Sequence, residues 1–286
     1  MIAIDWGTTS LRAYLVDNGE IISSRSTTQG VLSLDSVDFK RLFDDITQDW
    51  MGDVYLSGMV GSSKGWLETS YCETPFSLPS LSEHLVDISH LTNRPAWIVP
   101  GIKQTSPVNM MRGEEVQTLG AITVQPSMDC IILCGTHSKH VLVSDNTITH
   151  FDTFMTGELY SILQQHSILA GTEEWGEADF LLGVSESSSS MSLLQQLFTV
   201  RAHTLSDAIR FPRAYLSGLL IGTEIHNAAL LKDAHSCTIV GSKRLMALYE
   251  LALSSCHPDM QICLLSAEDA TLAGLQTIQR RHRDTI

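Results

Sequence analysis

The first residues of the chain hold the pattern that most constrains how it can fold. An apolar run ends in Asp5, a short turn contains Gly7, Thr8 and Thr9, and β-forming residues return from Leu11 onward. This order predicts two strands joined by a tight turn. Backbone N–H groups and hydroxyls in such a turn point into one concavity that favours phosphate oxygens, and a carboxylate at the strand end can hold Mg²⁺ or one of its waters. An ordinary hairpin with a threonine-rich turn is the alternative.

The same pattern returns about half a chain later. The apolar segment 131–134 ends in Gly135 and Thr136, and another apolar run follows Lys139. Two copies of strand, Gly-Thr turn and strand form a weak internal repeat, which carries more weight than either copy alone. We therefore interpret the two turns together.

Two glutamates lie between the turns, directly after Gly113. Glu114 and Glu115 fall at the predicted start of a helix, and Gln117 follows on the same face as Glu114. Transfer of a phosphoryl group to a hydroxyl needs a base within reach of that hydroxyl, and a carboxylate can serve. Adjacent helical residues point about 100° apart, so only one of the two glutamates can face a given ligand. Acidic residues that only stabilise the helix dipole are the alternative.

Periodicity and turn residues predict alternating strands and helices along the chain. We predict strands at 2–5, 11–17, 20–26, 53–57, 96–99, 131–134, 237–240 and 261–265. We predict helices at 38–50, 156–168, 174–183, 191–201, 213–231, 243–255 and 270–280, with the serine-rich stretch 185–192 as a loop. The expected architecture is α/β, with a mixed five-stranded sheet flanked by helices in each of two domains, at 1–111 and 112–286.

Composition limits the classes of function. The 286 residues are 43% hydrophobic and 17% charged, which is typical of a globular protein, and no apolar run reaches the roughly 18 residues of a membrane span. The net charge of −14 argues against a nucleic-acid partner, so an anionic ligand would have to be held by local basic residues. Those beside the motifs are Arg12, Lys64, Arg112, Lys139 and Arg201. The six cysteines form no CxxC motif and the chain starts with no export signal, which together indicate a reduced, cytoplasmic setting.

Several segments together resemble the 2-dehydro-3-deoxygalactonokinase family of the sugar kinase, Hsp70 and actin superfamily. The matching stretches are Ile4-Asp5-Trp6-Gly7, Gly58-Met59-Val60-Gly61-Ser62 with Gly65-Trp66, Met111-Arg112-Gly113-Glu114-Glu115 with Gln117, Gly135-Thr136-His137 with Lys139, Met155-Thr156-Gly157-Glu158-Leu159, His166-Ser167 and 216–222. They cover nearly the whole chain in order. The sequence departs from the family at His140, where an aromatic residue is usual, at Cys134, where proline is more usual, and around Glu73. These departures concern fine substrate preference more than the type of reaction.

The resemblance implies two actin-like (ribonuclease H-like) domains, each a mixed sheet flanked by helices, with an ATP cleft between them. It implies ATP-dependent phosphorylation of the 6-hydroxyl of 2-dehydro-3-deoxy-D-galactonate in D-galactonate catabolism. The implied catalytic residues are Glu114 or Glu115 as the base, with Arg112, and Asp5 orienting Mg²⁺ through water. The implied nucleotide-binding residues are Asp5, Gly7, Thr8, Thr9, Arg12, Gly135, Thr136, Ser138, Lys139, Gly241, Ser242 and Ala267. The implied substrate-binding residues are Gly58, Met59, Gly61, Ser62, Trp66 and Arg112, the last as a candidate for the substrate carboxylate.

Three alternatives stay open at this stage. One is a kinase for a related 2-keto-3-deoxy or aldonic sugar acid. Another is a non-catalytic nucleotide-binding regulator on the same fold, against which both threonine turns and Glu114 speak. A metal-dependent hydrolase that uses His137 and His140 would need further clustered ligands. The expected partners are ATP and a small sugar acid, with neither nucleic acid nor membrane, and a homodimer stays open.

Overall fold

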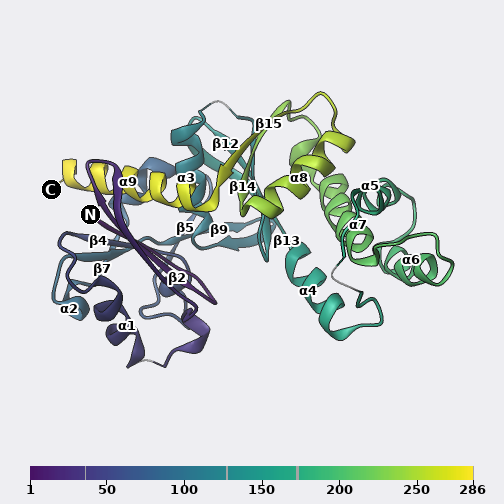
Figure 1. The fold of residues 1–286 in the computed structure, drawn as a ribbon. Coiled ribbons are helices and arrows are strands. Elements are labelled where there is room, and N and C mark those ends of the chain that lie inside the picture. Colours follow the sequence, from purple (N-terminus) through teal and green to yellow (C-terminus); the bar gives the residue numbers. More distant parts are fainter. Residues whose placement is uncertain (36, 127, 172–173, 286) are drawn as a thin grey trace. The chain divides into compact units, whose positions relative to one another are not determined.

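The computed structural model describes residues 1–35, 37–126, 128–171 and 174–285 (Figure 1). They form two compact units. Unit one comprises Met1–Ser127, Val143–Phe151 and Ala267–Ile286, and unit two comprises Met128–Leu142 and Asp152–Ser266. The predicted boundary at residue 112 falls inside unit one, whose first segment continues to Ser127. The chain also returns to unit one at Val143 and again at Ala267.

The main sheet of unit one is built around the N-terminal strand. Its described strands follow the order β3 (Glu20–Thr27), β2 (Leu11–Asp17), β1 (Ile2–Trp6), β4 (Val54–Ser57), β8 (Ala96–Ile98) and β7 (Val86–Asp87). β2 pairs antiparallel with β1, whereas β4 lies parallel to β1 on its other side. Ile2, Ile4 and Trp6 are fully buried because β1 is a central strand with packed faces. The sheet is mixed, as predicted, but it has six described strands rather than five.

Shorter elements complete unit one. A second sheet has the order β10 (Val108–Met111), β9 (Gly101–Thr105) and β5 (Tyr71–Glu73), and β6 (Phe76–Ser77) pairs with the start of β13 (Thr147–Phe154). The helical elements are η1 (Val31–Ser33), α1 (Asp38–Thr47), η2 (Met59–Gly61), η3 (Leu78–Glu83), α2 (Ser89–Thr92), α3 (Glu114–Val124) and α9 (Ala267–Thr285). α1 buries Phe39, Leu42 and Phe43 on one face, and it ends before residue 50 because Gln48 leaves the helical conformation.

Helices α3 and α9 pack against each other within unit one, although unit two lies between them in the sequence (Figure 1). Each helix presents a glycine to the backbone of its partner. A Cβ atom on Gly120 would collide with the carbonyl oxygen of Ala270, and a Cβ on Gly274 would collide with that of Val116. The contact therefore depends on the absence of a side chain at both positions.

Unit two contains strands of another mixed sheet. They follow the order β15 (Gln261–Ser266), β14 (Ser236–Gly241), β11 (Cys130–Leu133) and β12 (Ser138–Ser144). β14 is parallel to both of its neighbours, and β11 pairs antiparallel with β12. Both copies of the predicted strand, Gly-Thr turn and strand pattern are thus antiparallel pairs, with a third strand parallel to the first. The internal repeat predicted from the sequence is confirmed.

The helices of unit two are α4 (Thr156–His166), α5 (Glu177–Glu186), α6 (Leu193–Leu205), α7 (Pro212–Asn227), η4 (Ala229–Leu231) and α8 (Lys243–Cys256). Each overlaps a predicted helix. The long helix predicted at 213–231 is split, because the chain is extended at Ala228 before η4 begins.

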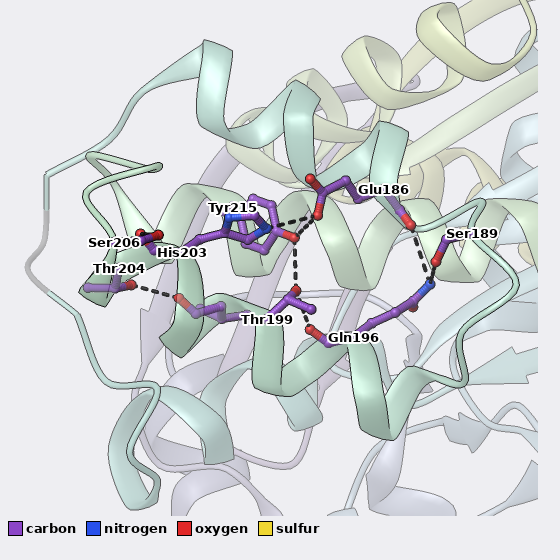
Figure 2. A network of polar contacts seen from close by, with 9 residues as sticks. Glu186, Ser189, Gln196, Thr199, His203, Thr204, Ser206 and Tyr215 are labelled. Atoms are coloured by element: carbon purple, nitrogen blue, oxygen red, sulfur yellow. Dashed lines mark hydrogen bonds and ion pairs between the residues drawn. The ribbon is translucent and has the colours of Figure 1, made fainter.

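A polar network joins α5, α6 and α7 (Figure 2). The carboxylate of Glu186, at the end of α5, accepts a hydrogen bond from the hydroxyl of Tyr215 on α7 and lies 3.3 Å from Nε2 of His203 on α6. The Tyr215 hydroxyl also lies 3.0 Å from that of Thr199. Glu186 thus joins three helices through a tyrosine and a histidine.

Candidate active site

The backbone of the first Gly-Thr turn is held in place, and its threonine side chains are exposed. The N–H of Gly7 donates to the carbonyl of Ser10 at 2.9 Å, which closes the turn between β1 and β2. Gly30 lies behind it, where a Cβ atom would collide with the backbone of Thr8 and Thr9. The side chains of both threonines are exposed. The turn therefore presents two exposed hydroxyls on a backbone that is held in place.

Asp5 lies at the carboxyl end of β1, level with Ser57 at the end of the parallel strand β4. Loops at such strand ends are where open α/β sheets bind their ligands. The surroundings of Asp5 raise its pKa, mainly through burial, with the Arg12 guanidinium at 3.9 Å opposing the shift and Glu114 adding to it. The charge of Glu114 thus acts on Asp5, and the glycine contacts between their segments give the geometry.

Two glycines with positive φ bring the start of α3 to this strand end. Gly58 follows β4 with φ 94°, and Gly113 precedes α3 with φ 102°. Few other residues adopt this backbone conformation. A Cβ on Gly113 would lie 3.2 Å from the Cα of Gly58, and a Cβ on Gly58 would lie 3.4 Å from Oδ1 of Asp5. Gly58, which the sequence assigned to the substrate, thus joins the two carboxylate-bearing segments.

The two adjacent glutamates at the start of α3 have different environments. Glu114 is half-buried, and its carboxylate accepts a hydrogen bond from the N–H of Arg112 at 2.9 Å. Glu115 is fully buried, and both of its carboxylate oxygens accept from the N–H of Gly113, at 2.8 and 2.9 Å. Burial, with a further contribution from Glu114, raises the pKa of Glu115 to about 8. This arrangement favours Glu114 over Glu115 as the residue that can reach a ligand.

Arg112 is held more firmly than the sequence indicated. Its side chain is buried, its two terminal nitrogens donate to the hydroxyl and the carbonyl oxygen of Thr69, and the guanidinium lies 4.2 Å from the ring centre of Tyr71. The Nε atom has no hydrogen-bond partner among the described residues. Arg112 therefore links α3 to the segment that follows the Gly58–Ser62 loop.

In and beside the Gly58–Ser62 loop are buried polar atoms that have no hydrogen-bond partner in the described part of the chain. They are Oγ of Ser57, Oγ of Ser62 and Nε1 of Trp6. Buried polar atoms normally find a partner, so this group favours a polar ligand or ordered water at the loop. Trp66 instead packs into the core, with its ring 5.3 Å from that of Phe43.

The second Gly-Thr turn lies in unit two, and α4 packs against it. Thr136 is exposed, and its carbonyl oxygen accepts the N–H of Glu158 at 2.9 Å. A Cβ on Gly157 would collide with the carbonyl oxygen of Gly135. Lys139 is buried on β12, as is Ser138, whose hydroxyl donates to Glu224 at 2.6 Å. Ser138, predicted to bind phosphate, therefore points into the protein interior.

A cavity of about 290 Å³ in unit two borders this turn. Its lining includes Gly135, Thr156, Tyr160, Leu220, Leu245 and Tyr249. The predicted adenosine residues Gly241 and Ser242 lead into α8, which contributes part of this wall, and Oγ of Ser242 caps the helix by accepting the N–H of Leu245 at 3.4 Å. Ala267, predicted beside them, begins α9 in unit one. The sequence did not reveal the lining residues on α4 and α7, since their positions follow from helix packing.

Comparison with known proteins identifies the family. The sequence model of the 2-keto-3-deoxy-galactonokinase family matches residues 5–278. The chain belongs to this family. As a 2-keto-3-deoxy-galactonokinase family member, it is 34% identical over 291 residues to the 2-dehydro-3-deoxygalactonokinase of Escherichia coli strain K12, with 97% of this chain and 96% of the relative covered. The resemblance inferred from the sequence motifs is confirmed.

Solved structures show the same relationship for this 2-keto-3-deoxy-galactonokinase family member. A crystal structure of a protein from Sinorhizobium meliloti, assigned as a 2-dehydro-3-deoxygalactonokinase, has a TM-score of 0.86 and 30% identity, with 98% of each chain covered. Component A of the (R)-2-hydroxyglutaryl-CoA dehydratase of Acidaminococcus fermentans, at a TM-score of 0.58 and 12% identity over 98% of each chain, shares the fold alone. The predicted actin-like α/β fold is confirmed.

The two histidines considered as metal ligands, His137 and His140, each pair with a glutamate instead. His140 is buried and its Nε2 lies 2.7 Å from Glu224, whereas His137 is half-exposed and pairs with Glu158.

Among the positions that the structure gives, no group of three or more His, Cys, Asp or Glu side chains is arranged to hold a metal ion. Within the described ranges, no helix combines the length and apolar character needed to cross a membrane.

Proposed function

We infer that the protein transfers the γ-phosphoryl group of ATP to the 6-hydroxyl of 2-dehydro-3-deoxy-D-galactonate, which yields the 6-phosphate and ADP. Family membership and the 34% identical relative support the substrate. The structural observation that carries the proposal is the approach of Gly113, which precedes Glu114, to Gly58, whose Cβ would lie 3.4 Å from Oδ1 of Asp5 at the carboxyl end of β1. A base next to a phosphate-binding turn is what phosphoryl transfer to a hydroxyl requires.

In the proposed reaction, Glu114 accepts the proton of the 6-hydroxyl. The hydroxyl oxygen forms a bond to the γ-phosphorus, and the bond from that phosphorus to the β–γ bridging oxygen breaks, so that ADP leaves. We propose that Gly7, Thr8, Thr9 and Arg12 bind nucleotide phosphate in unit one. In unit two we propose this role for Gly135 and Thr136, whereas the side chain of Lys139 is buried on β12. The cavity of unit two, with its apolar and aromatic lining, is proposed to bind the adenosine.

Asp5 fits a role in holding Mg²⁺. Its side chain is 26% exposed at the strand end and lies next to the turn proposed to bind phosphate. Mg²⁺ keeps several waters and is usually bound through one or two carboxylates together with substrate phosphates, so a single aspartate suits it. The ion would neutralise charge that develops on the phosphates.

We propose that the sugar acid binds at the Gly58–Ser62 loop, where the hydroxyls of Ser57 and Ser62 have no hydrogen-bond partner among the described residues. Arg112 is proposed to attract the substrate carboxylate, through Nε or by sharing the nitrogens that now bond Thr69. Met59 and Gly61, which form η2 of this loop, and Trp66 behind it would shape the site.

The substrate assignment can be tested by measuring ADP release with a panel of sugar acids and neutral hexoses. We expect kcat/KM to be highest for 2-dehydro-3-deoxy-D-galactonate and negligible for neutral hexoses. A higher value for another 2-keto-3-deoxy or aldonic acid would support the alternative kinase. ATP binding without turnover of any sugar acid would support a non-catalytic regulator.

Replacing Thr136 with valine is expected to raise the Kd for ADP about tenfold. The change removes a hydroxyl that we assign to a phosphate, and a hydrogen bond to a charged group contributes on this scale. Isothermal titration calorimetry gives the affinity, and Thr204→Val, which alters an exposed threonine on α6, is the matched control. Equal ADP affinity in the Thr136 and Thr204 variants would remove Thr136 from the nucleotide site.

We propose a cytoplasmic enzyme that acts as a homodimer. All six cysteines are free thiols, which suits a reducing compartment. Leu194, Phe198 and Leu205 are exposed on one face of α6, which supports self-association. Light scattering of the purified protein gives the mass in solution, and a monomer at micromolar concentration would contradict the dimer.

A further inference from the structure

One buried carboxylate in unit two collects hydrogen bonds from four side chains. Oε1 of Glu224 accepts from Ser138 at 2.6 Å and from Nε2 of His140 at 2.7 Å. Oε2 accepts from Tyr249 at 2.7 Å and also from the hydroxyl of Thr156. Glu224 is only 3% exposed, so these four donors replace the water that would otherwise solvate its charge.

The four donors lie either in the wall of the 290 Å³ cavity, here called the nucleotide cavity, or on the strand that follows the turn beside it. Thr156 begins α4 and Tyr249 lies on α8, and both line the cavity itself. Ser138 and His140 lie on β12, directly after the Gly135–Thr136 turn. Glu224, on α7, is therefore the common partner of β12, α4 and α8 where these elements meet behind the turn.

The same junction fixes the turn through the backbone of α4. Gly157, next to Thr156, packs so closely that a Cβ atom would collide with Gly135, and the N–H of Glu158 donates to the carbonyl of Thr136 at 2.9 Å. A shift of Thr156 would therefore move the turn. The bond from Thr156 to Glu224 couples the turn to α7.

The charge state of Glu224 fits this role. Burial alone would raise the pKa of Glu224, but the hydrogen bond and electrostatic attraction of His140, together with the bonds from Ser138 and Thr156, hold it below its ordinary value. The carboxylate is thus ionised and can only accept hydrogen bonds, so all four partners are oriented as donors toward it.

We propose that Glu224 is a positioning residue, whose buried carboxylate fixes the Gly135–Thr136 turn and the start of α4 in the geometry that binds the nucleotide phosphates. The proposal rests on the nucleotide site of the proposed function. No atom of Glu224 is required to touch the nucleotide. Loss of the carboxylate should therefore weaken nucleotide binding without altering recognition of the sugar acid, which we assign to unit one.

The test compares Glu224→Gln with Glu186→Gln. The control glutamate lies in the same unit and is likewise bonded to a tyrosine and a histidine, but it joins α5, α6 and α7 and lines no part of the nucleotide cavity (Figure 2). We expect Glu224→Gln to raise the Kd for ADP and the KM for ATP about tenfold or more, while the KM for the sugar acid stays within twofold. Glu186→Gln should leave all three constants near those of the wild type, even if it lowers the Tm.

Ser138→Ala is the second variant, in case the glutamine variant does not fold. The Ser138 side chain is fully buried, so its loss can reach the nucleotide only through Glu224 and the turn. A several-fold rise in the Kd for ADP is expected. If both Glu224→Gln and Ser138→Ala bind ADP as tightly as the wild type, the proposal is overturned. If Glu224→Gln does not fold, wild-type ADP affinity in Ser138→Ala alone overturns it. Equal losses in Glu224→Gln and Glu186→Gln would also overturn it.

Binding of ADP by calorimetry separates this proposal from the proposed function. A wild-type protein that binds ADP but phosphorylates no sugar acid would refute the substrate assignment and leave the comparison of variants valid. A wild-type protein that does not bind ADP would refute both.

Discussion

Replacing Glu114 with glutamine is expected to lower kcat by about 10²–10⁴-fold, the usual contribution of a positioned base. Glutamine keeps the shape of the side chain but cannot accept the proton of the attacking hydroxyl. The Kd for ADP should stay close to that of the wild type, because Glu114 is not assigned to the nucleotide. Steady-state kinetics of ADP release, with calorimetry of ADP binding, measure the two effects separately.

Glu115→Gln is the matched control for this change. Glu115 is the neighbouring residue, but it is fully buried and its carboxylate is bonded to the N–H of Gly113. We expect a much smaller loss of kcat than in Glu114→Gln. The reverse order would move the role of base to Glu115. Normal turnover in both variants would place the base elsewhere, with Asp5 and Glu158 as the next candidates.

The free energy of unfolding is expected to fall as the pH rises from about 5 to about 8, with Glu115 as a main cause. Its pKa is about 8 in the folded protein, against an ordinary value of 4.5, because burial and Glu114 disfavour its charge. Between these two values the folded state binds more protons than the unfolded state, so stability decreases with increasing pH. The full effect is about 3–5 kcal/mol, at about 1.4 kcal/mol per pKa unit.

Urea denaturation of the wild type and of Glu115→Gln across pH 5–9 measures this contribution. The glutamine variant removes the titrating group, so the difference in unfolding free energy between the two proteins should change by a few kcal/mol over the range. Asp5, whose pKa is also raised, affects both proteins alike and cancels in the difference. A difference that is independent of pH would show that Glu115 is ionised in the folded protein.

The local features of the fold could be predicted from the sequence, because they depend on neighbouring residues. The apolar run before Asp5, the Gly-Thr turn and the β-forming residues from Leu11 were enough to predict β1 and β2. Gly113 followed by two glutamates predicted the start of α3. The membership of α9 in unit one could not be predicted. It depends on Gly120 meeting Ala270, a contact between distant parts of the sequence that leaves no local pattern.

In the candidate site, the sequence indicated some residues correctly but did not reveal which way other side chains point. The exposed threonines and Glu114 belong to motifs with a regular place in the chain, so their types and spacing indicated a role. Arg112 and Ser138 lie in the same motifs, yet their side chains point inward, toward Thr69 and Glu224. Which way a side chain points at a strand or helix start depends on what packs beside it, and Glu224 itself lies in a helix whose sequence showed only its apolar face.

The pairing of α3 with α9 also has a consequence for synthesis of the protein. A ribosome produces the chain from its N-terminus, so α3 emerges long before the helix that covers it, and the whole of unit two is made in the interval. Until α9 has been synthesised, the Gly120 face of α3 stays uncovered and unit one is incomplete. All strands and helices of unit two are synthesised before α9. The half of the protein that starts first is thus the half that finishes folding last.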